Sequence, residues 1–353
     1  MRRQRVRLWQ LSEIGLTDFD GFTIRKPENN RFVQPIFTFD GKMLKLVRWP
    51  NTDKSSEWPR VTTLNRGYCD RYTSDPSNNG TGLAKVQYTT DRPNSWGYNF
   101  DEIIYNGYWR YDWANEVLFA TVDKKAKTIE AQASLFYGCD GSNRPFQVFN
   151  VFEELDEPGE WYIDRTGGKM YLYPYETTND TPVFKMTDKD FDLITINNAS
   201  HVTISGIEVT AGKQKGITID GGTEVCIDNC SINGFENVGL AINSGTGNGV
   251  KNSRVFDCGI GGIILNGGDK TNIIPAGNYV ENCDIHDFAQ LQETYAPGVS
   301  LNGVGNVVKN CEIHSAPHAA ILFNGVDNVV EYNSIHDVCL NAGDMGAIYT
   351  GRH

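Results

Sequence analysis

The sequence predicts an all-β protein with a parallel β-helix (a solenoid) in its second half, and three observations carry this prediction. The 353 residues include 36 Gly and 11% aromatic residues, a composition typical of turn-rich β proteins. Short aliphatic segments recur after residue 200. The composition also changes near residue 190, because all seven Trp lie at or before Trp161, whereas residues 191–353 carry 17 Asp and Glu against seven Lys and Arg. We therefore expect two domains, 1–190 and 191–353.

The repeat is the strongest of these signals. Each copy holds a motif such as Asn229-Cys230-Ser231-Ile232, followed by two more aliphatic runs, and the copies are separated by Gly and Asn turns. Three short strands in every 22 to 30 residues describe one coil of a parallel β-helix, and the segment accommodates about six coils. A leucine-rich repeat is the main rival, but its Leu and Asn spacing is absent. The aligned aliphatic positions are Ile207, Ile232, Val255, Ile285, Ile313 and Ile335.

The cysteines follow the same repeat. None of the eight forms a C-x-x-C pair, which argues against a zinc ribbon or a thioredoxin-type site. Cys230, Cys283 and Cys311 occupy one position in their coils, and Ser253 and Asn333 occupy it in others. We expect an interior ladder of small residues with buried thiols and no metal.

Two copies are longer than the others, and the extra residues fall at 270–277 and 289–297. Loops on a solenoid usually lie on one face and build its binding site. The second loop offers Glu293 and Tyr295 as candidate ligand-binding residues.

The first domain lacks the repeat and is expected to be β-rich. Phe37–Arg48 has an Asp40-Gly41 turn between two strands, and a second strand pair flanks 164–168. Residues 101–116 carry five Tyr and Trp side chains, which indicate either a sugar-stacking wall or the aromatic core of a β-sandwich.

A column of histidines suggests chemistry. His286, His314 and His336 each follow the aliphatic anchor of successive coils, and Asp287 and Asp337 come directly after two of them. Because coils stack about 4.8 Å apart, the three imidazoles are expected to be neighbours on one stripe. They would bind sugar hydroxyls or a metal, orient a catalytic acid, or serve only the structure. Repulsion between neighbouring imidazolium groups predicts that most are neutral at pH 7.

Asp344 is the candidate catalytic carboxylate. It precedes the last predicted strand beside Gly343, and Arg352 is close in sequence. The alternative is a turn aspartate that caps backbone amides. Glycoside hydrolysis needs two carboxyl groups about 5–5.5 Å or about 6.5–9.5 Å apart, distances that coils stacked one or two apart supply. The candidate partners within this chain are Asp287, Glu293 and Asp337.

The chain resembles the large right-handed parallel β-helix proteins related to glycoside hydrolase family 141, which includes fucosidase and xylanase activities. The resemblance rests on four segments that span most of the chain. They are 44–51 (LKLVRWPN), 107–114 (GYWRYDWA), 153–165 (EELDEPGEWYIDR) and 335–352 (IHDVCLNAGDMGAIYTGR).

This resemblance implies a β-helix with a right-handed turn, interrupted near its start by an antiparallel β-sandwich-like insert over most of 1–190. It also implies that Asp344 is one catalytic carboxylate and that the second comes about two coils later, beyond residue 353. We therefore expect a fragment that lacks both ends of the family's domain. Relatives are often exported, whereas the start of this chain has no apolar signal segment.

The formal charge of −12 argues against nucleic acid or an anionic membrane as partner, and no apolar run has the length of a membrane span. Three classes of function stay open. The first is a glycosidase on plant or other complex polysaccharide, without a cofactor. The second is a polysaccharide lyase, which needs a Lys or Arg base and often Ca²⁺. The third is a non-catalytic carbohydrate-binding solenoid. The residues expected to bind substrate are His286, Asp287, Glu293, Tyr295, His314, His318, His336, Asp337, Tyr349 and Arg352.

Overall fold

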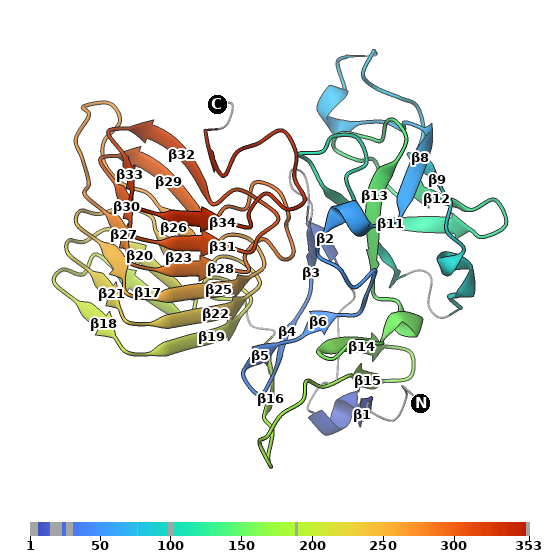
Figure 1. Cartoon of the computed structure of the whole chain (residues 1–353), viewed down its shortest axis with the longest axis horizontal. Coiled ribbons are helices and arrows are strands. Elements are labelled where there is room, and N and C mark those ends of the chain that lie inside the picture. Colours follow the sequence, from blue (N-terminus) through green and yellow to red (C-terminus); the bar gives the residue numbers. More distant parts are fainter. Residues whose placement is uncertain are drawn as a thin grey trace. The chain divides into compact units, whose positions relative to one another are not determined.

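The computed structural model describes residues 6–14, 23–25, 31–75, 77–97, 102–187 and 190–350. The chain divides into two compact units (Figure 1). Unit 1 comprises Met1–Gln34 and Phe39–Phe184, and unit 2 comprises Pro35–Thr38 and Lys185–His353. In the part of the chain that the structure describes, none of the helical turns has the length and apolar character needed to cross a membrane.

Unit 2 is a parallel β-helix made of three sheets, called sheets G, I and J here (Figure 1). Each coil contributes one strand to each sheet in the order G, I, J, so the described residues form six full coils and the first strand of a seventh. Sheet G consists of β17 (Ile194–Asn197), β20 (Ile217–Asp220), β23 (Leu240–Ile242), β26 (Ile263–Leu265), β29 (Val299–Val304), β32 (Ile321–Val326) and β35 (Ile348–Tyr349). Sheet I consists of β18 (Thr203–Ser205), β21 (Cys226–Asp228), β24 (Gly249–Lys251), β27 (Tyr279–Glu281), β30 (Val307–Lys309) and β33 (Val329–Glu331). Sheet J consists of β19 (Glu208–Gly212), β22 (Ser231–Phe235), β25 (Arg254–Cys258), β28 (Asp284–His286), β31 (Glu312–His314) and β34 (Ser334–His336).

The register of sheet J confirms the predicted repeat from the second coil onward. Ile232 pairs with Val255, and the pairing continues in step to Ile335. In the first coil the prediction is wrong by two residues, because Val209 and not Ile207 pairs with Ile232. Val209 is buried, whereas Ile207 is 38% exposed. Ile207 therefore precedes the strand, at the position that Cys230 occupies one coil later.

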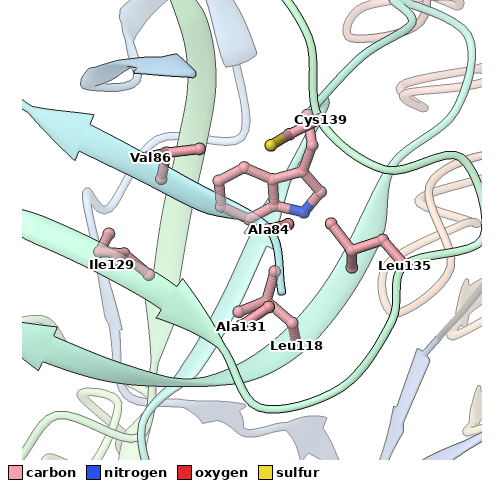
Figure 2. A pocket seen from close by; sticks show the side chains of 8 residues that line it. Ala84, Val86, Leu118, Ile129, Ala131, Leu135 and Cys139 are labelled. Carbon is pink, nitrogen blue, oxygen red and sulfur yellow. The ribbon is translucent and has the colours of Figure 1, made fainter. Parts of the chain in front are cut away.

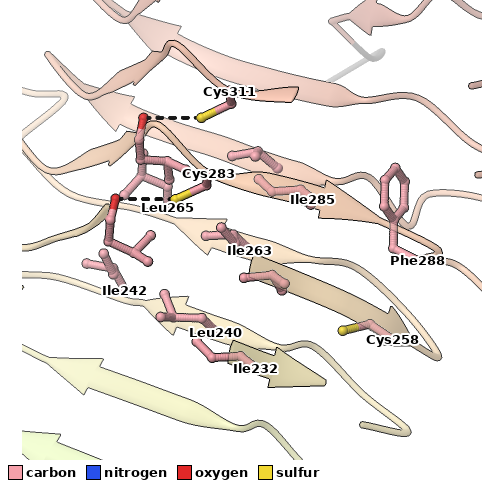
Figure 3. Packing of buried hydrophobic residues seen from close by; sticks show 14 of the residues in the cluster. Ile232, Leu240, Ile242, Cys258, Ile263, Leu265, Cys283, Ile285, Phe288 and Cys311 are labelled. Carbon is pink, nitrogen blue, oxygen red and sulfur yellow. Dashed lines mark hydrogen bonds between the residues drawn. The ribbon is translucent and has the colours of Figure 1, made fainter. Parts of the chain in front are cut away.

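Aliphatic side chains fill the interior of the β-helix in stacked rows (Figure 3). The predicted cysteine column lies among them. Cys230, Cys283 and Cys311 are buried free thiols, and Figure 3 shows the last two donating to backbone carbonyls of the preceding coil. Ser253 belongs to the same column, and its Oγ accepts the Cys230 N–H at 3.0 Å.

A second interior column consists of asparagines at the start of the sheet I strands. The side-chain oxygen of each one accepts the backbone N–H of its counterpart in the preceding coil. These distances are 2.8 Å from Asn248 N to Asn278, 3.3 Å from Asn278 N to Asn306 and 3.0 Å from Asn306 N to Asn328. The first three of these side chains are fully buried, so the column satisfies backbone groups that water does not reach.

The two insertions leave the helix at different corners. Residues 270–277 lie between β26 in sheet G and β27 in sheet I, whereas 289–297 lie between β28 in sheet J and β29 in sheet G. The expectation that both loops build one face is therefore wrong. Only the second insertion shares a corner with Asp344.

Unit 1 is mainly antiparallel. Its described sheets have the strand orders β1-β15-β14-β6, β10-β11-β12-β9-β8-β13-β7 and β2-β3. A further sheet has the order β16-β4-β5, and most residues of its strands β4 and β16 belong to unit 2. The first eight strands are β1 (Arg7–Gln10), β2 (Thr23–Arg25), β3 (Arg31–Val33), β4 (Ile36–Phe39), β5 (Lys42–Met43), β6 (Lys45–Leu46), β7 (Arg48–Trp49) and β8 (Arg60–Asn65). The next eight are β9 (Lys85–Tyr88), β10 (Ile104–Gly107), β11 (Glu116–Asp123), β12 (Thr128–Ala131), β13 (Arg144–Phe149), β14 (Glu160–Asp164), β15 (Lys169–Leu172) and β16 (Phe184–Thr187). The 3₁₀ turns are η2 (Leu11–Ile14), η3 (Ser55–Glu57), η4 (Asp70–Tyr72), η5 (Arg92–Ser95) and η7 (Phe152–Glu154).

Both strand pairs predicted for residues 1–190 are present. β4 pairs with β5 across Asp40 and Gly41, whose φ angles of 53° and 81° are both positive, as the tightest hairpin turns require. β14 pairs antiparallel with β15.

The aromatic segment of unit 1 divides between core and surface. Tyr105, Tyr108 and Trp109 are buried, so the core alternative is correct for these three. A small apolar pocket adjoins the Trp109 indole, and Figure 2 shows side chains such as Val86 and Cys139 around it. The indole N–H donates to the Glu116 carbonyl at 2.7 Å, and the pocket belongs to the core. Tyr111 and Trp113 are partly exposed and stack on each other at 4.7 Å.

A buried carboxylate also holds unit 1 together. Glu154 is 2% exposed and accepts two hydrogen bonds of 2.7 Å from the Arg92 guanidinium. The buried Trp96 indole N–H donates to the same carboxylate at 2.5 Å. Glu154 lies in one of the segments that carry the family resemblance, and its contacts are those of a structural residue.

Candidate active site

The predicted histidine column forms a continuous stack on the outer face of sheet J. His286 and His314 have ring centroids 5.0 Å apart, and His314 and His336 have centroids 4.8 Å apart, with rings within 11° of parallel. Phe256 extends the stack by one coil, at 4.9 Å from His286. The parallel register of β25, β28, β31 and β34 places these four residues directly above one another.

The Nδ1 atom of each imidazole is bonded to the side chain of the next residue. The distances are 2.7 Å from His286 to Asp287, 2.9 Å from His314 to Ser315 and 2.9 Å from His336 to Asp337. These second residues have φ angles between 48° and 56°, a region in which Asp is more common than most residues. The local backbone conformation therefore explains in part why Asp occurs at positions 287 and 337.

The Nε2 atoms also have partners, which come from a neighbouring column of strand residues. His314 Nε2 lies 3.2 Å from Asp284, and His336 Nε2 lies 3.1 Å from Glu312. His286 Nε2 is 3.2 Å from the Arg254 guanidinium. Every ring nitrogen of the three histidines is thus engaged within the protein, so this stack is a hydrogen-bonded structural element before any ligand binds.

Carboxylates raise the pKa of two histidines in the stack. The hydrogen bond that His286 donates to the Asp287 carboxylate raises the pKa of His286 above its ordinary value, and the nearby Asp284 adds to this, against the opposing effects of burial and of the Arg254 guanidinium. Hydrogen bonds to Asp337 and Glu312 likewise raise the pKa of His336. The prediction that most imidazoles are neutral at pH 7 considered only their mutual repulsion, whereas these acceptors favour the charged form of His286 and His336.

Asp344 lies on the loop between β34 and β35 and is exposed, with a φ of 52°. Tyr349, on β35, pairs with Leu322 of the preceding coil and is partly exposed. Arg352, the expected partner of a substrate acid, lies outside the described residues.

Three loops at the corner between sheet J and sheet G stack in successive coils. They comprise residues 287–298, 315–320 and 337–347, and we call them the three-loop cluster. Five backbone hydrogen bonds join the second and third loops, for example from Cys339 N to His318 O at 3.0 Å. Asp344 is therefore carried by a loop that is fixed to the one below it.

Glu293, expected to face ligand, is 7% exposed, and its Oε2 accepts the Asn341 side-chain amide at 3.0 Å. This bond joins the first and third loops across two coils. Tyr295 is 47% exposed and remains accessible. The sequence analysis missed Asn341, because irregular loops carry no repeat that would align it with Glu293.

His318, at the centre of the cluster, is 2% exposed. Its Nε2 accepts the backbone N–H of Tyr295 at 2.8 Å, so the ring is neutral and carries its proton on Nδ1. Burial lowers the pKa of His318 to about 3. His318 is therefore a buried, neutral residue that connects the first and second loops of the cluster.

Among the described residues, no group of three or more His, Cys, Asp and Glu side chains has the geometry of a metal site. A polysaccharide lyase would need a Lys or Arg base, and two basic residues of the β-helix are paired with acids. Arg254 lies 3.4 Å from Asp284, and Lys309 lies 3.2 Å from Glu281.

Comparison with known families agrees with this architecture. A family model described as a right-handed β-helix region matches residues 192–289. Unit 2 is thus a right-handed parallel β-helix. No curated protein sequence matches the chain.

Three solved structures are similar to the chain. One described as a glycoside hydrolase superposes with a TM-score of 0.63 at 13% identity, over 93% of this chain and 69% of that one. The A-module of the mannuronan C-5 epimerase AlgE4 from Azotobacter vinelandii has a TM-score of 0.29 at 12% identity, over 46% and 52% of the two chains. A complex of XylC with xylose has a TM-score of 0.37 at 10% identity, over 95% and 51%. At these identities the first similarity concerns the fold, which this chain shares with a glycoside hydrolase across both units.

Proposed function

We propose that the protein is a glycoside hydrolase that acts on plant or other complex polysaccharide, with Asp344 as one of its two catalytic carboxylates. The observation that carries this proposal is the position of Asp344. Its side chain is exposed on the loop that precedes β35, and this loop is hydrogen-bonded to the coil below. The shared fold with a glycoside hydrolase and the family resemblance of residues 335–352 support the same role.

In this proposal Asp344 serves as the nucleophile or as the general acid and base. Either role needs a second carboxyl group, whose separation from Asp344 decides whether the anomeric configuration is retained or inverted. Asp287 and Asp337 are each bonded to an imidazole, and Glu293 is buried against Asn341, so none of them is proposed as that partner.

Sugar binding is assigned to accessible residues near the same corner. Tyr295 and Tyr349 present exposed aromatic surface on which a sugar ring can stack. His286, His314 and His336 line sheet J beside the loops, and we propose that their carboxylate partners, more than their ring nitrogens, meet sugar hydroxyls.

The test is an activity screen of the protein expressed from its complete gene. Reducing sugar released from plant polysaccharides is measured together with ultraviolet absorbance, which only a lyase product with a new double bond generates. We expect reducing sugar without such absorbance. We also expect Asp344→Asn to lower kcat at least about a thousandfold, the scale seen when a principal catalytic group is removed.

Asp327→Asn is the matched control. Asp327 is also exposed and also has a positive φ, of 56°, but it lies between β32 and β33, at the corner between sheets G and I. Asn tolerates this backbone conformation, so both variants should fold. Near-normal activity of Asp344→Asn, or an equal loss in Asp327→Asn, would contradict the assignment.

A further inference from the structure

The three-loop cluster contains a set of polar contacts that the proposed chemistry does not use. Its first and third loops are joined by the bond of 3.0 Å from Asn341 Nδ2 to Glu293 Oε2. Its first and second loops are joined by the bond of 2.8 Å from Tyr295 N to His318 Nε2. Both acceptors are more than nine-tenths buried, so water does not compete strongly for either bond.

The third loop needs such support because it has little regular structure. Eleven residues, 337–347, connect β34 to β35, and β35 itself has only two residues. Backbone bonds from residues 339–342 hold the first part of this loop to the second loop. Asn341 precedes Asp344 by three residues, which limits their separation to about 10 Å.

We propose that Glu293, His318 and Asn341 are positioning residues, which fix the loop carrying Asp344 in its productive conformation before substrate binds. The catalytic meaning of this inference rests on the proposed function, whereas the structural part stands on the contacts themselves. None of the three touches the reacting atoms in this assignment. They act through the backbone of residues 339–344.

The contacts also join loops of unequal length at one corner. The first loop has twelve residues and the second has six, so their backbones cannot pair in register. The side chains of Glu293 and His318 are long enough to make hydrogen bonds between loops whose backbones do not pair. Glu293 spans two coils by its side chain, where backbone bonds join only adjacent coils.

The experiment compares four variants in the full protein. Asn341→Leu and Glu293→Met remove the bond between the loops, while Leu keeps the branched shape of Asn and Met keeps the approximate length of Glu. Glu293→Gln keeps a carbonyl oxygen that can accept the Asn341 amide. Asn302→Leu is the control, because the Asn302 amide also donates between coils, to Asn266 at 2.9 Å, but it lies on sheet G outside the cluster.

The first measurement is amide hydrogen exchange of the peptide that covers 337–347, which needs no substrate. We expect exchange at least about tenfold faster in Asn341→Leu and Glu293→Met, and wild-type exchange in Glu293→Gln and Asn302→Leu. Circular dichroism and the thermal midpoint verify that each variant folds. Unchanged exchange in both Asn341→Leu and Glu293→Met, or exchange in Glu293→Gln as fast as in Glu293→Met, would overturn the inference.

The second measurement is kinetic, on whichever glycan the wild-type protein hydrolyses. A misplaced catalytic group lowers kcat by about 100-fold, and because substrate contacts are kept, KM should change little. Glu293→Gln should restore kcat. If the loop exchanges faster while kcat is unchanged, the positioning role is wrong. If the wild-type protein hydrolyses no glycan, the proposed function fails, and hydrogen exchange alone decides whether these residues hold the loop.

Discussion

The two units of this protein bury polar groups in opposite ways. In unit 2 the same group recurs in coil after coil, as in the asparagine column from Asn248 to Asn328. In unit 1 a single carboxylate, Glu154, serves both Arg92 and the Trp96 indole. In the repeated column, many equivalent hydrogen bonds each satisfy one backbone group, so the loss of one leaves the others in place. A unique buried carboxylate has no equivalent that can replace it. The comparison predicts larger effects of single substitutions in unit 1.

The largest effect on stability is expected for Glu154→Ala. It leaves the buried Trp96 N–H without its acceptor and removes the partner of Arg92, so we expect a loss of about 3 kcal/mol of unfolding free energy. All seven Trp lie at or before Trp161, so tryptophan fluorescence in urea follows unit 1. Glu153→Ala is the control, since Glu153 is exposed, and it should cost less than about 1 kcal/mol. An equal loss of unfolding free energy in Glu154→Ala and Glu153→Ala would contradict the proposed difference between the two units.

A smaller effect is expected within the β-helix. Asn278→Ala removes one acceptor and two donated bonds, at 2.8 and 3.2 Å, from a fully buried position, for a loss of about 2 kcal/mol. Asn328→Ala, at a partly exposed position, should cost about 1 kcal/mol. Circular dichroism should detect both losses while the fluorescence transition stays in place. A fluorescence transition that shifts equally would mean that the units do not unfold separately.

The smallest effect concerns pH and the histidine stack. Because the pKa values of His286 and His336 are raised above 6.5 in the folded protein, their charged form stabilises it below that pH, and the contribution is lost as pH rises through the folded values. We expect the thermal unfolding temperature of unit 2 to decrease as the pH is raised from 6 to 8. His286→Asn should flatten this dependence, and Asn is compatible with the column because Asn233 occupies it two coils earlier. A pH dependence identical in both proteins would exclude His286 as a source of it.

Periodicity explains how much of the fold could be predicted. The spacing of aliphatic residues predicted three sheets, the cysteine column and the histidine stack, because a stacked coil repeats the environment of each position. The first coil was misaligned because Ile207 is aliphatic yet exposed, and Gly206 stands where the next four coils have Asn. One sequence pattern there fits two registers.

The contacts between the loops could not be predicted, because the loops lack the periodicity that aligns the strands. Nothing in the spacing of Glu293, His318 and Asn341 relates them, and their proximity depends on three loops of different lengths. Of the hydrogen-bond partners of the imidazoles, the sequence indicated those that directly follow a histidine but not those from the preceding coil. Asp287 and Asp337 follow their histidines in sequence, but Asp284 and Glu312 bond histidines of the next coil.

The asparagine column spans 23 residues between Val225 and Asn248 but 30 between Asn248 and Asn278, and the bond lengths are 2.9 and 2.8 Å. The ladder is therefore indifferent to how much chain is looped out between its rungs. Evolution can lengthen, shorten or replace a corner segment while the scaffold keeps its stability, and new specificities can arise without a new fold.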